Sequence, residues 1–312
     1  MILHDLHAQR CGCDGGDVLP GLLPLDDALR TCAQHTGILQ EAETLPLAGA
    51  AGRHLARPLI FRAGGPPLQT GHCLSRRDIA LAVAAGAKAA TVRRRVRIAL
   101  LPSDTQAIAV GRMLRALMDR ADIEIVTCRP ATEGEPSPGI AAARPEDAAD
   151  LVVTIGAAPA DRAEHRSGAA AAAGETTIFA GVAIAPGGAV SFGRMGQALR
   201  LSLPGDTAAA FVGWHMFGRA IVSNMQGAEG ENRKTIVAAV GRLGHTPGKC
   251  ELRPARLVGF DESGRARVEP VADPDADGVR ALAQADGLLL IPAHEDNMRP
   301  GDLLEFYPLK DC

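Results

Sequence analysis

The sequence predicts an α/β protein with an N-terminal helical region, a central doubly wound sheet domain and a small C-terminal β domain. Three observations support this fold class. Residues 25–94 show helical apolar spacing, and over residues 95–226 short apolar runs alternate with helical patterns, which is typical of βαβ units and a parallel sheet. Residues 235–312 contain short strand patterns at regular spacing, which is typical of a separate β domain.

The composition is that of a folded protein without a strong charge bias. The chain has 312 residues, of which 46% are apolar and 22% charged, and this argues against disorder. Its formal net charge of −3 gives no general attraction for nucleic acid. The densest basic run contains Arg93, Arg94, Arg95 and Arg97 and directly precedes an apolar strand pattern. We interpret this run as the solvated start of that strand.

The cysteines and the lengths of the apolar runs predict the cellular compartment of the protein. Seven cysteines are scattered along the chain and do not resemble a disulfide framework, which fits a reducing environment. No apolar run reaches the ~20 residues that a membrane span needs, so we expect a cytoplasmic protein without a membrane partner. Residues 1–24 are expected to form a flexible leader, whose His4, His7, Cys11 and Cys13 match no standard zinc spacing.

The N-terminal region, residues 25–94, is predicted to hold three helices. The first covers residues 25–37, because Asp26 and Asp27 suit its first turn and Gly37 its end. A short second helix covers residues 47–55, and a third covers residues 74–86 and ends at a glycine. The segments between them are predicted to be extended or connecting: residues 41–47, 62–72 and 89–95.

The central domain, residues 95–226, is predicted to alternate strands with helices. The strands are residues 96–101, 123–126, 151–155, 182–185 and 199–203, and the helices are residues 107–120, 145–149, 168–174 and 208–222. In a parallel sheet the loops that follow the strands meet at the carboxyl edge, where ligands bind. We therefore expect three loops to lie together there, with the loop after Gly193 as a candidate fourth: residues 102–106, 156–164 and 204–207.

The C-terminal β domain, residues 235–312, follows a polar linker. Its predicted strands are residues 237–240, 252–258, 266–271, 287–291 and 303–309, and they are separated by glycine, proline and aspartate. These residue types are typical of turns between short strands.

Two turn motifs stand out in the central domain, Pro186-Gly187-Gly188 and Pro204-Gly205-Asp206. Glycine lets a ligand approach the backbone closely, and unpaired N–H groups at the start of a following helix favour an anion. Ordinary loops between strands and helices use the same residue types, and aspartate is also a common helix cap. The turns alone therefore do not distinguish an anion-binding site from ordinary loops.

Segments in order along both domains resemble the molybdopterin molybdenumtransferases, the MoeA-like family that includes the C-terminal domain of gephyrin. They are residues 92–101, 150–156, 182–196, 201–206, 252–259, 282–292 and 299–309. The resemblance implies a central molybdopterin-binding domain of the MoaB/Mog-like kind, and a homodimer. It also implies the family's reaction, in which molybdate is inserted into adenylylated molybdopterin with magnesium and AMP is released.

The resemblance also implies roles for individual residues. The pterin and its phosphate would contact Ser103, Thr154, Gly156, Pro186, Gly187, Ser191, Gly193, Pro204 and Gly205. The catalytic candidates are Asp104, Asp161 and Asp206, and the candidate metal ligands are Asp104 and Glu164.

The chain departs from the family pattern at several of the positions that carry chemistry. The family's N-terminal signature and its inserted β domain are absent, Gln106 stands at a glutamate position and Arg162 at an aspartate position. Ala185 and Gly188 stand at two lysine positions. Magnesium prefers carboxylate oxygens, and lysines would have met the oxyanions as point charges. The departures predict a catalytically degenerate site that keeps its glycine-rich backbone.

Three functions are compatible with this pattern. The first is a molybdopterin-binding protein that serves in molybdenum cofactor biosynthesis or delivers the cofactor to a molybdoenzyme. The second is an active molybdenumtransferase whose missing groups come from another subunit. The third is a protein-binding scaffold without ligand, because a fold alone does not determine function. The pterin form, the metal oxyanion and the recipient protein stay open.

Overall fold

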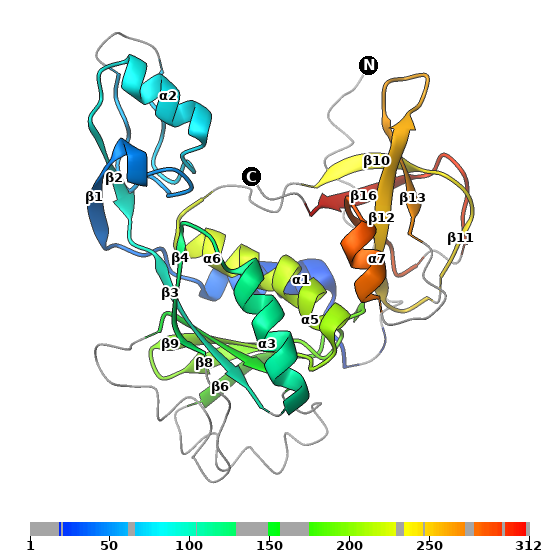
Figure 1. The fold of residues 1–312 in the computed structure, drawn as a ribbon. Coiled ribbons are helices and arrows are strands. Elements are labelled where there is room, and N and C mark those ends of the chain that lie inside the picture. The colour runs from blue at the N-terminus through cyan, green and yellow to red at the C-terminus, as the bar shows by residue number, and fades with distance from the viewer. Residues whose placement is uncertain are drawn as a thin grey trace.

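The computed structural model describes residues 19, 21–61, 66–103, 105–128, 149–156, 175–228, 234–245, 247–271, 278–294 and 297–309. Figure 1 shows three parts: a small lobe that contains β1, β2 and α2, a central α/β domain, and a C-terminal β domain on the other side of the view from the lobe. The predicted fold class is confirmed, with a central α/β domain followed by a β domain. Among these residues no helix is long and apolar enough to cross a membrane.

The first helix, α1 (Leu25–His35), belongs to the core of the central domain. Asp26 and Asp27 lie in its first turn, as predicted, where carboxylates favour the positive end of the helix dipole. The buried side chains of α1 are Leu25, Ala28 and Cys32. Burial raises the pKa of the Cys32 thiol to about 12, so this group packs as a small apolar side chain.

The lobe, residues 42–93, combines strands with a helix. Its strands β1 (Ala42–Pro46) and β2 (Ala89–Arg93) pair antiparallel, and α2 (Arg76–Ala84) contributes Ala82 to the lobe's small core. The helix predicted at residues 47–55 is wrong, because only η1 (Leu47–Gly49) is helical. Gly52 has a φ of 76°, which a helix does not accommodate. Residues 25–94, predicted to be helical, therefore also contain a strand pair.

Helix α2 begins at a capping box formed by Ser75 and Asp78. One carboxylate oxygen of Asp78 accepts hydrogen bonds from the Ser75 amide at 2.8 Å and the Ser75 hydroxyl at 2.7 Å, and it lies 3.0 Å from Nε2 of His72. Burial of Asp78 opposes its ionisation, but the hydrogen bonds from Ser75 and His72 outweigh burial and lower the pKa of this carboxyl.

We predict that Asp78→Asn destabilises the lobe by about 1 kcal/mol at pH 7, because it removes the acceptor of the capping box. The pKa of Asp78 is lowered in the folded state, so its stabilisation is present above the unfolded pKa of about 3.9 and is lost as the pH falls through the folded value. Urea unfolding of both proteins at pH 7 and at pH 3 measures this. A difference in unfolding free energy that does not shrink at pH 3 contradicts the prediction.

The central sheet has six strands in the order β4-β3-β5-β9-β8-β6. The strands β3 (Val96–Pro102), β4 (Ile123–Cys128), β5 (Leu151–Ile155) and β9 (Ala198–Leu203) are parallel. They match four of the predicted strands. Two antiparallel strands, β8 (Ser191–Met195) and β6 (Glu175–Ala180), extend the sheet at one edge. The predicted strand at residues 182–185 shrinks to β7 (Ile184–Ala185), which leaves this sheet and joins the C-terminal one.

The helices of the central domain that the structure describes all contribute to one core with α1. They are α3 (Thr105–Leu117) and a continuous helix made of α5 (Thr207–Gly213), the π-helical segment η4 (Trp214–Gly218) and α6 (Arg219–Met225). Both match predicted helices. On the other face of the sheet a small apolar cluster contains Leu101 and Val152. The helices predicted at residues 145–149 and 168–174 lie outside the described residues, apart from Ala149.

Within the long helix, His215 is buried in the π-helical segment. Its ring stacks on Phe211 with the centroids 6.2 Å apart. Burial, and then the charge of Arg219, lower the pKa of His215 to about 3. The imidazole therefore stays neutral at physiological pH and acts as a packing group.

The C-terminal domain is a small closed barrel. Its strands are β10 (Thr235–Ala239), β12 (Cys250–Phe260), β13 (Ala266–Pro270), β14 (Gly287–Ile291) and β16 (Leu303–Pro308). The barrel closes because β12 pairs with β14 on one side and β13 on the other. These strands match the prediction. The additional elements are β11 (Leu243–Gly244), β15 (Asn297–Met298) and α7 (Val279–Gln284), which the sequence pattern did not indicate.

Residues 183–185 link the two larger domains. Strand β7 pairs parallel with the first residues of β12, with Ile184 opposite Cys250, and the Cys250 amide donates to the Ala183 carbonyl at 2.8 Å. Cys250 is completely buried and disulfide-bonded. The scattered spacing of the cysteines, which does not resemble a disulfide framework, did not indicate this bond.

Candidate ligand site at the carboxyl edge of the central sheet

The loops that follow three parallel strands lie side by side, as the sequence predicts. Ser103 is the first residue after β3, and its amide donates to the carbonyl of Ile155, the last residue of β5, at 2.9 Å. The amide of Gly156 donates to the carbonyl of Leu203, the last residue of β9, at 3.0 Å. These bonds continue the strand pairing past the strand ends, so the three loops start at one line along the sheet edge.

Glycine allows two of these loops to touch through their backbones. Gly156 has a φ of 76°, which favours glycine. A Cβ atom on Gly205 would lie 3.2 Å from the Cα atom of Gly156, closer than side chains normally pack. The two predicted binding residues therefore form a surface made of backbone atoms, which a ligand can approach closely.

Asp206 caps the long helix that starts beside this surface. Its Oδ1 atom accepts a hydrogen bond from the Ala209 amide at 2.8 Å. One carboxylate oxygen of this predicted catalytic residue is therefore used in holding the helix N-terminus. The other acidic candidates, Asp104, Asp161 and Glu164, lie outside the described residues. Within the described part of the chain, no group of three or more His, Cys, Asp or Glu side chains could hold a metal ion.

The turn at Pro186 and Gly187 lies against the same helix end. Gly187 has a φ of +105°, and a Cβ atom there would lie 3.3 Å from the Ala209 carbonyl oxygen. Ala209 also donates its amide to the capping carboxylate of Asp206. The two turn motifs that the sequence singles out therefore meet at the first turn of α5.

A row of hydroxyl groups crosses the sheet close to these loops. Thr154 on β5 and Ser191 on β8 both lie directly opposite Ser202 on β9. The Thr154 hydroxyl donates to the Ser202 oxygen at 2.8 Å. Sequence reasoning missed Ser202. The alternation Leu201-Ser202-Leu203 in a strand could have indicated it, because side chains of one strand alternate between the two faces.

The close packing of two strands explains why glycine is present at position 193. Gly193 lies inside β8, where a Cβ atom would come within 2.0 Å of the Thr176 carbonyl oxygen on β6. Glycine therefore permits the close approach of these two strands at a β-bulge. Ligand contact at Gly193 stays a prediction.

Comparisons with known proteins agree with this architecture. Residues 241–309 match the family model of the MoeA C-terminal region, domain IV. The molybdopterin molybdenumtransferase of Haemophilus influenzae is 20% identical over 264 residues, which cover 79% of this chain and 64% of that relative. The chain thus spans less than two thirds of the length of this curated relative.

Solved structures show the same fold over most of the chain. A molybdenum cofactor biosynthesis protein from Pyrococcus furiosus has a TM-score of 0.70 and 20% identity, covering 92% of this chain and 99% of that one. The molybdopterin biosynthesis MoeA protein from Pyrococcus horikoshii has a TM-score of 0.71 and 14% identity, covering 92% of this chain and 100% of that one. Residues 241–309 are thus similar to domain IV of MoeA, and most of the chain has the same fold as these MoeA and molybdenum cofactor biosynthesis proteins.

Proposed function

We propose that this chain binds molybdopterin in molybdenum cofactor biosynthesis or delivery, and that it does not itself transfer molybdenum. The observation that carries the proposal is the meeting of three strand-end loops at Ser103, Gly156 and Gly205. The start of a helix at such an edge favours an anionic phosphate. The curated relative from Haemophilus influenzae carries the name of an enzyme that acts on this pterin.

The positions where the family has charged side chains support binding without transfer. At Gly188, a family lysine position, a Cβ atom would lie 3.0 Å from the Ile184 carbonyl oxygen and 3.2 Å from that of Val182. This turn therefore has little room for a lysine. Gln106, which replaces a glutamate, lies exposed in the first turn of α3. It offers a neutral amide where magnesium would prefer a carboxylate.

Titration with molybdopterin and with its adenylylated form, in the presence and absence of magnesium, tests the proposal. We expect saturable binding of a pterin form and no release of AMP that depends on magnesium and molybdate. AMP release would identify an active molybdenumtransferase instead. Absence of binding by both forms would overturn the proposal and favour a protein-binding scaffold.

We predict that Ser103→Asp weakens pterin binding at least about tenfold, because it places a negative charge beside the phosphate. Ser103→Asn, which has nearly the same shape without the charge, should bind like the wild type. Ser103 is exposed, so both variants should keep the wild-type unfolding temperature. Equal weakening by the two variants would assign the effect to shape and count against a phosphate at this edge.

A further inference from the structure

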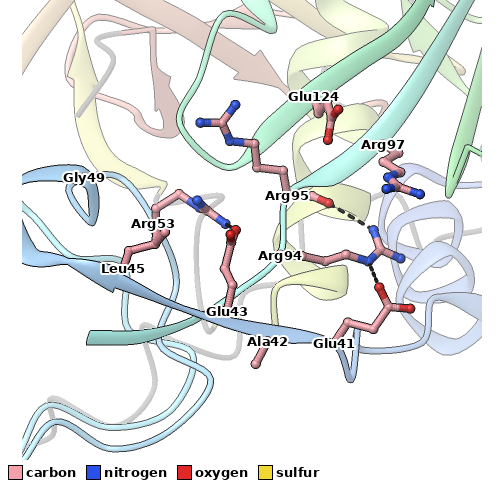
Figure 2. A pocket seen from close by; sticks show the side chains of 10 residues that line it. All are labelled: Glu41, Ala42, Glu43, Leu45, Gly49, Arg53, Arg94, Arg95, Arg97 and Glu124. Atoms are coloured by element: carbon pink, nitrogen blue, oxygen red, sulfur yellow. Dashed lines mark hydrogen bonds and ion pairs between the residues drawn. The ribbon is translucent and has the colours of Figure 1, made fainter. Parts of the chain in front are cut away.

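A cleft of about 590 Å³ lies at the opposite edge of the central sheet from the strand-end loops at Ser103, Gly156 and Gly205, which we call the pterin loops. It is formed between the lobe and the first residues of β3 and β4, and Figure 2 shows the side chains that line it. Arginine is the commonest residue there, with Arg53 coming from the lobe and Arg94, Arg95 and Arg97 from the basic run. Ligand sites often lie between structural units, and this volume is within their usual range.

Two of these arginines are held firmly by protein groups. Arg94 forms a bidentate pair with Asp150, with N–O distances of 2.6 Å and 2.8 Å, and also contacts Glu41. The hydrogen bonds that Arg94 donates to Asp150 are the largest cause that raises the pKa of Arg94. Arg53 is 2% exposed and donates to Glu43 at 2.5 Å and to the Arg93 carbonyl at 2.7 Å. The Nε atom of Arg53 is buried without a hydrogen-bond partner.

The other two arginines have no carboxylate within ion-pair distance in the described chain. Arg97 lies directly opposite Glu124 in the pairing of β3 with β4, yet the two side chains form no ion pair there. In Figure 2 the guanidinium groups of Arg95 and Arg97 carry no dashed contact. The cleft thus combines fixed arginines with two whose donors are available.

We propose that this cleft binds a phosphate-bearing small molecule through Arg95 and Arg97, against the rigid wall formed by Arg53 and Arg94. Guanidinium groups recognise phosphate through paired N–H donors. Glu124 lies in the same cleft and opposes an anion, so it limits the affinity. The site is separate from the pterin loops, because the seven residues of β3 span about 20 Å between the two sheet edges.

Pyrophosphate is the probe that tests this site, by calorimetric titration at low ionic strength. We expect R95Q/R97Q to bind at least about tenfold more weakly than the wild type. The matched control is R112Q/R115Q, which removes the same charge from two exposed arginines of α3 that do not line the cleft. It should bind like the wild type.

Glu124→Gln should bind pyrophosphate several-fold more tightly, because it removes the opposing charge. A gain of affinity cannot come from misfolding, so this variant keeps the proposal falsifiable if R95Q/R97Q is unstable. No saturable binding by the wild type, equal weakening by R112Q/R115Q, or no gain with Glu124→Gln would each overturn the proposal. Loss of pyrophosphate binding in Ser103→Asp would also overturn it, by assigning the anion to the pterin loops.

Discussion

Arg93→Met is expected to loosen the lobe from the central domain and to cost about 3–5 kcal/mol of the lobe's stability, because it leaves buried carbonyls without donors. Arg93 is 9% exposed, and burial lowers its pKa. Its Nε donates to the carbonyl of Gln226, just after α6, at 2.9 Å, and its NH1 group donates to the carbonyl of Leu39. A cation at a helix C-terminus is also favoured by the helix dipole.

The same junction is tied by further contacts. The Gln226 side-chain amide donates to the Arg94 carbonyl at 2.9 Å, and a Cβ atom on Gly71 of the lobe would lie 2.0 Å from the Gly227 carbonyl oxygen. The lobe therefore lies directly on the end of α6. Loss of Arg93 should release several contacts together.

Hydrogen exchange of the lobe, residues 42–93, measures this effect. In Arg93→Met we expect the amides of β1 and β2 to lose protection while those of β5 keep theirs. Arg93→Lys keeps the charge but has fewer donors, so the protection of its β1 and β2 amides should fall between that of the wild type and that of Arg93→Met. The matched control is Arg112→Met, at an exposed position on α3. Unchanged protection of β1 and β2 in Arg93→Met would show that the lobe is held mainly by apolar packing.

Arg93 also shows where sequence reasoning reaches its limit. The basic run is expected to be solvated, and Arg95 is indeed exposed, but Arg93 is buried. Its partners are Leu39 and the carbonyl of Gln226, and the latter lies 133 positions away in the chain. No local pattern among four arginines indicates which of them meets a distant helix end.

The central strands and the convergence of the loops were predictable for a physical reason. Continuous apolar runs such as residues 151–155 are typical of strands that are buried on both faces, and parallel strands place their following loops at one edge. The sequence did not distinguish strands β6 and β8 from the turns around them. Gly193 lies inside β8, and the pairing of β6 with β8 shifts register between Thr177 and Phe179. The cap at Asp206 follows from its residue type, but the hydroxyl pair between Thr154 and Ser202 depends on strand register.

Gly218→Ala is expected to destabilise the central domain by about 3 kcal/mol, because its Cβ atom would overlap the indole ring of Trp214. The nearest ring atom would lie 2.0 Å away. Trp214 is 2% exposed and belongs to the core that includes the central sheet, so the ring has little freedom to move. Gly37→Ala is the matched control, because nothing lies within 4 Å of its Cβ position, and it should change stability by less than about 0.5 kcal/mol.

A double-mutant cycle with Trp214→Leu separates overlap from loss of helix geometry. If the overlap is the cause, Gly218→Ala should cost at least about 1.5 kcal/mol less in the Trp214→Leu background. Urea unfolding followed by circular dichroism measures all four proteins, and additive costs would contradict the overlap.

The helix that contains Gly218 begins at the cap of Asp206 and is followed by Gln226, whose carbonyl accepts a hydrogen bond from Arg93. Because π-helical segments are frequent at functional sites, we expect Gly218→Ala to weaken pterin binding and to loosen the lobe in the same protein.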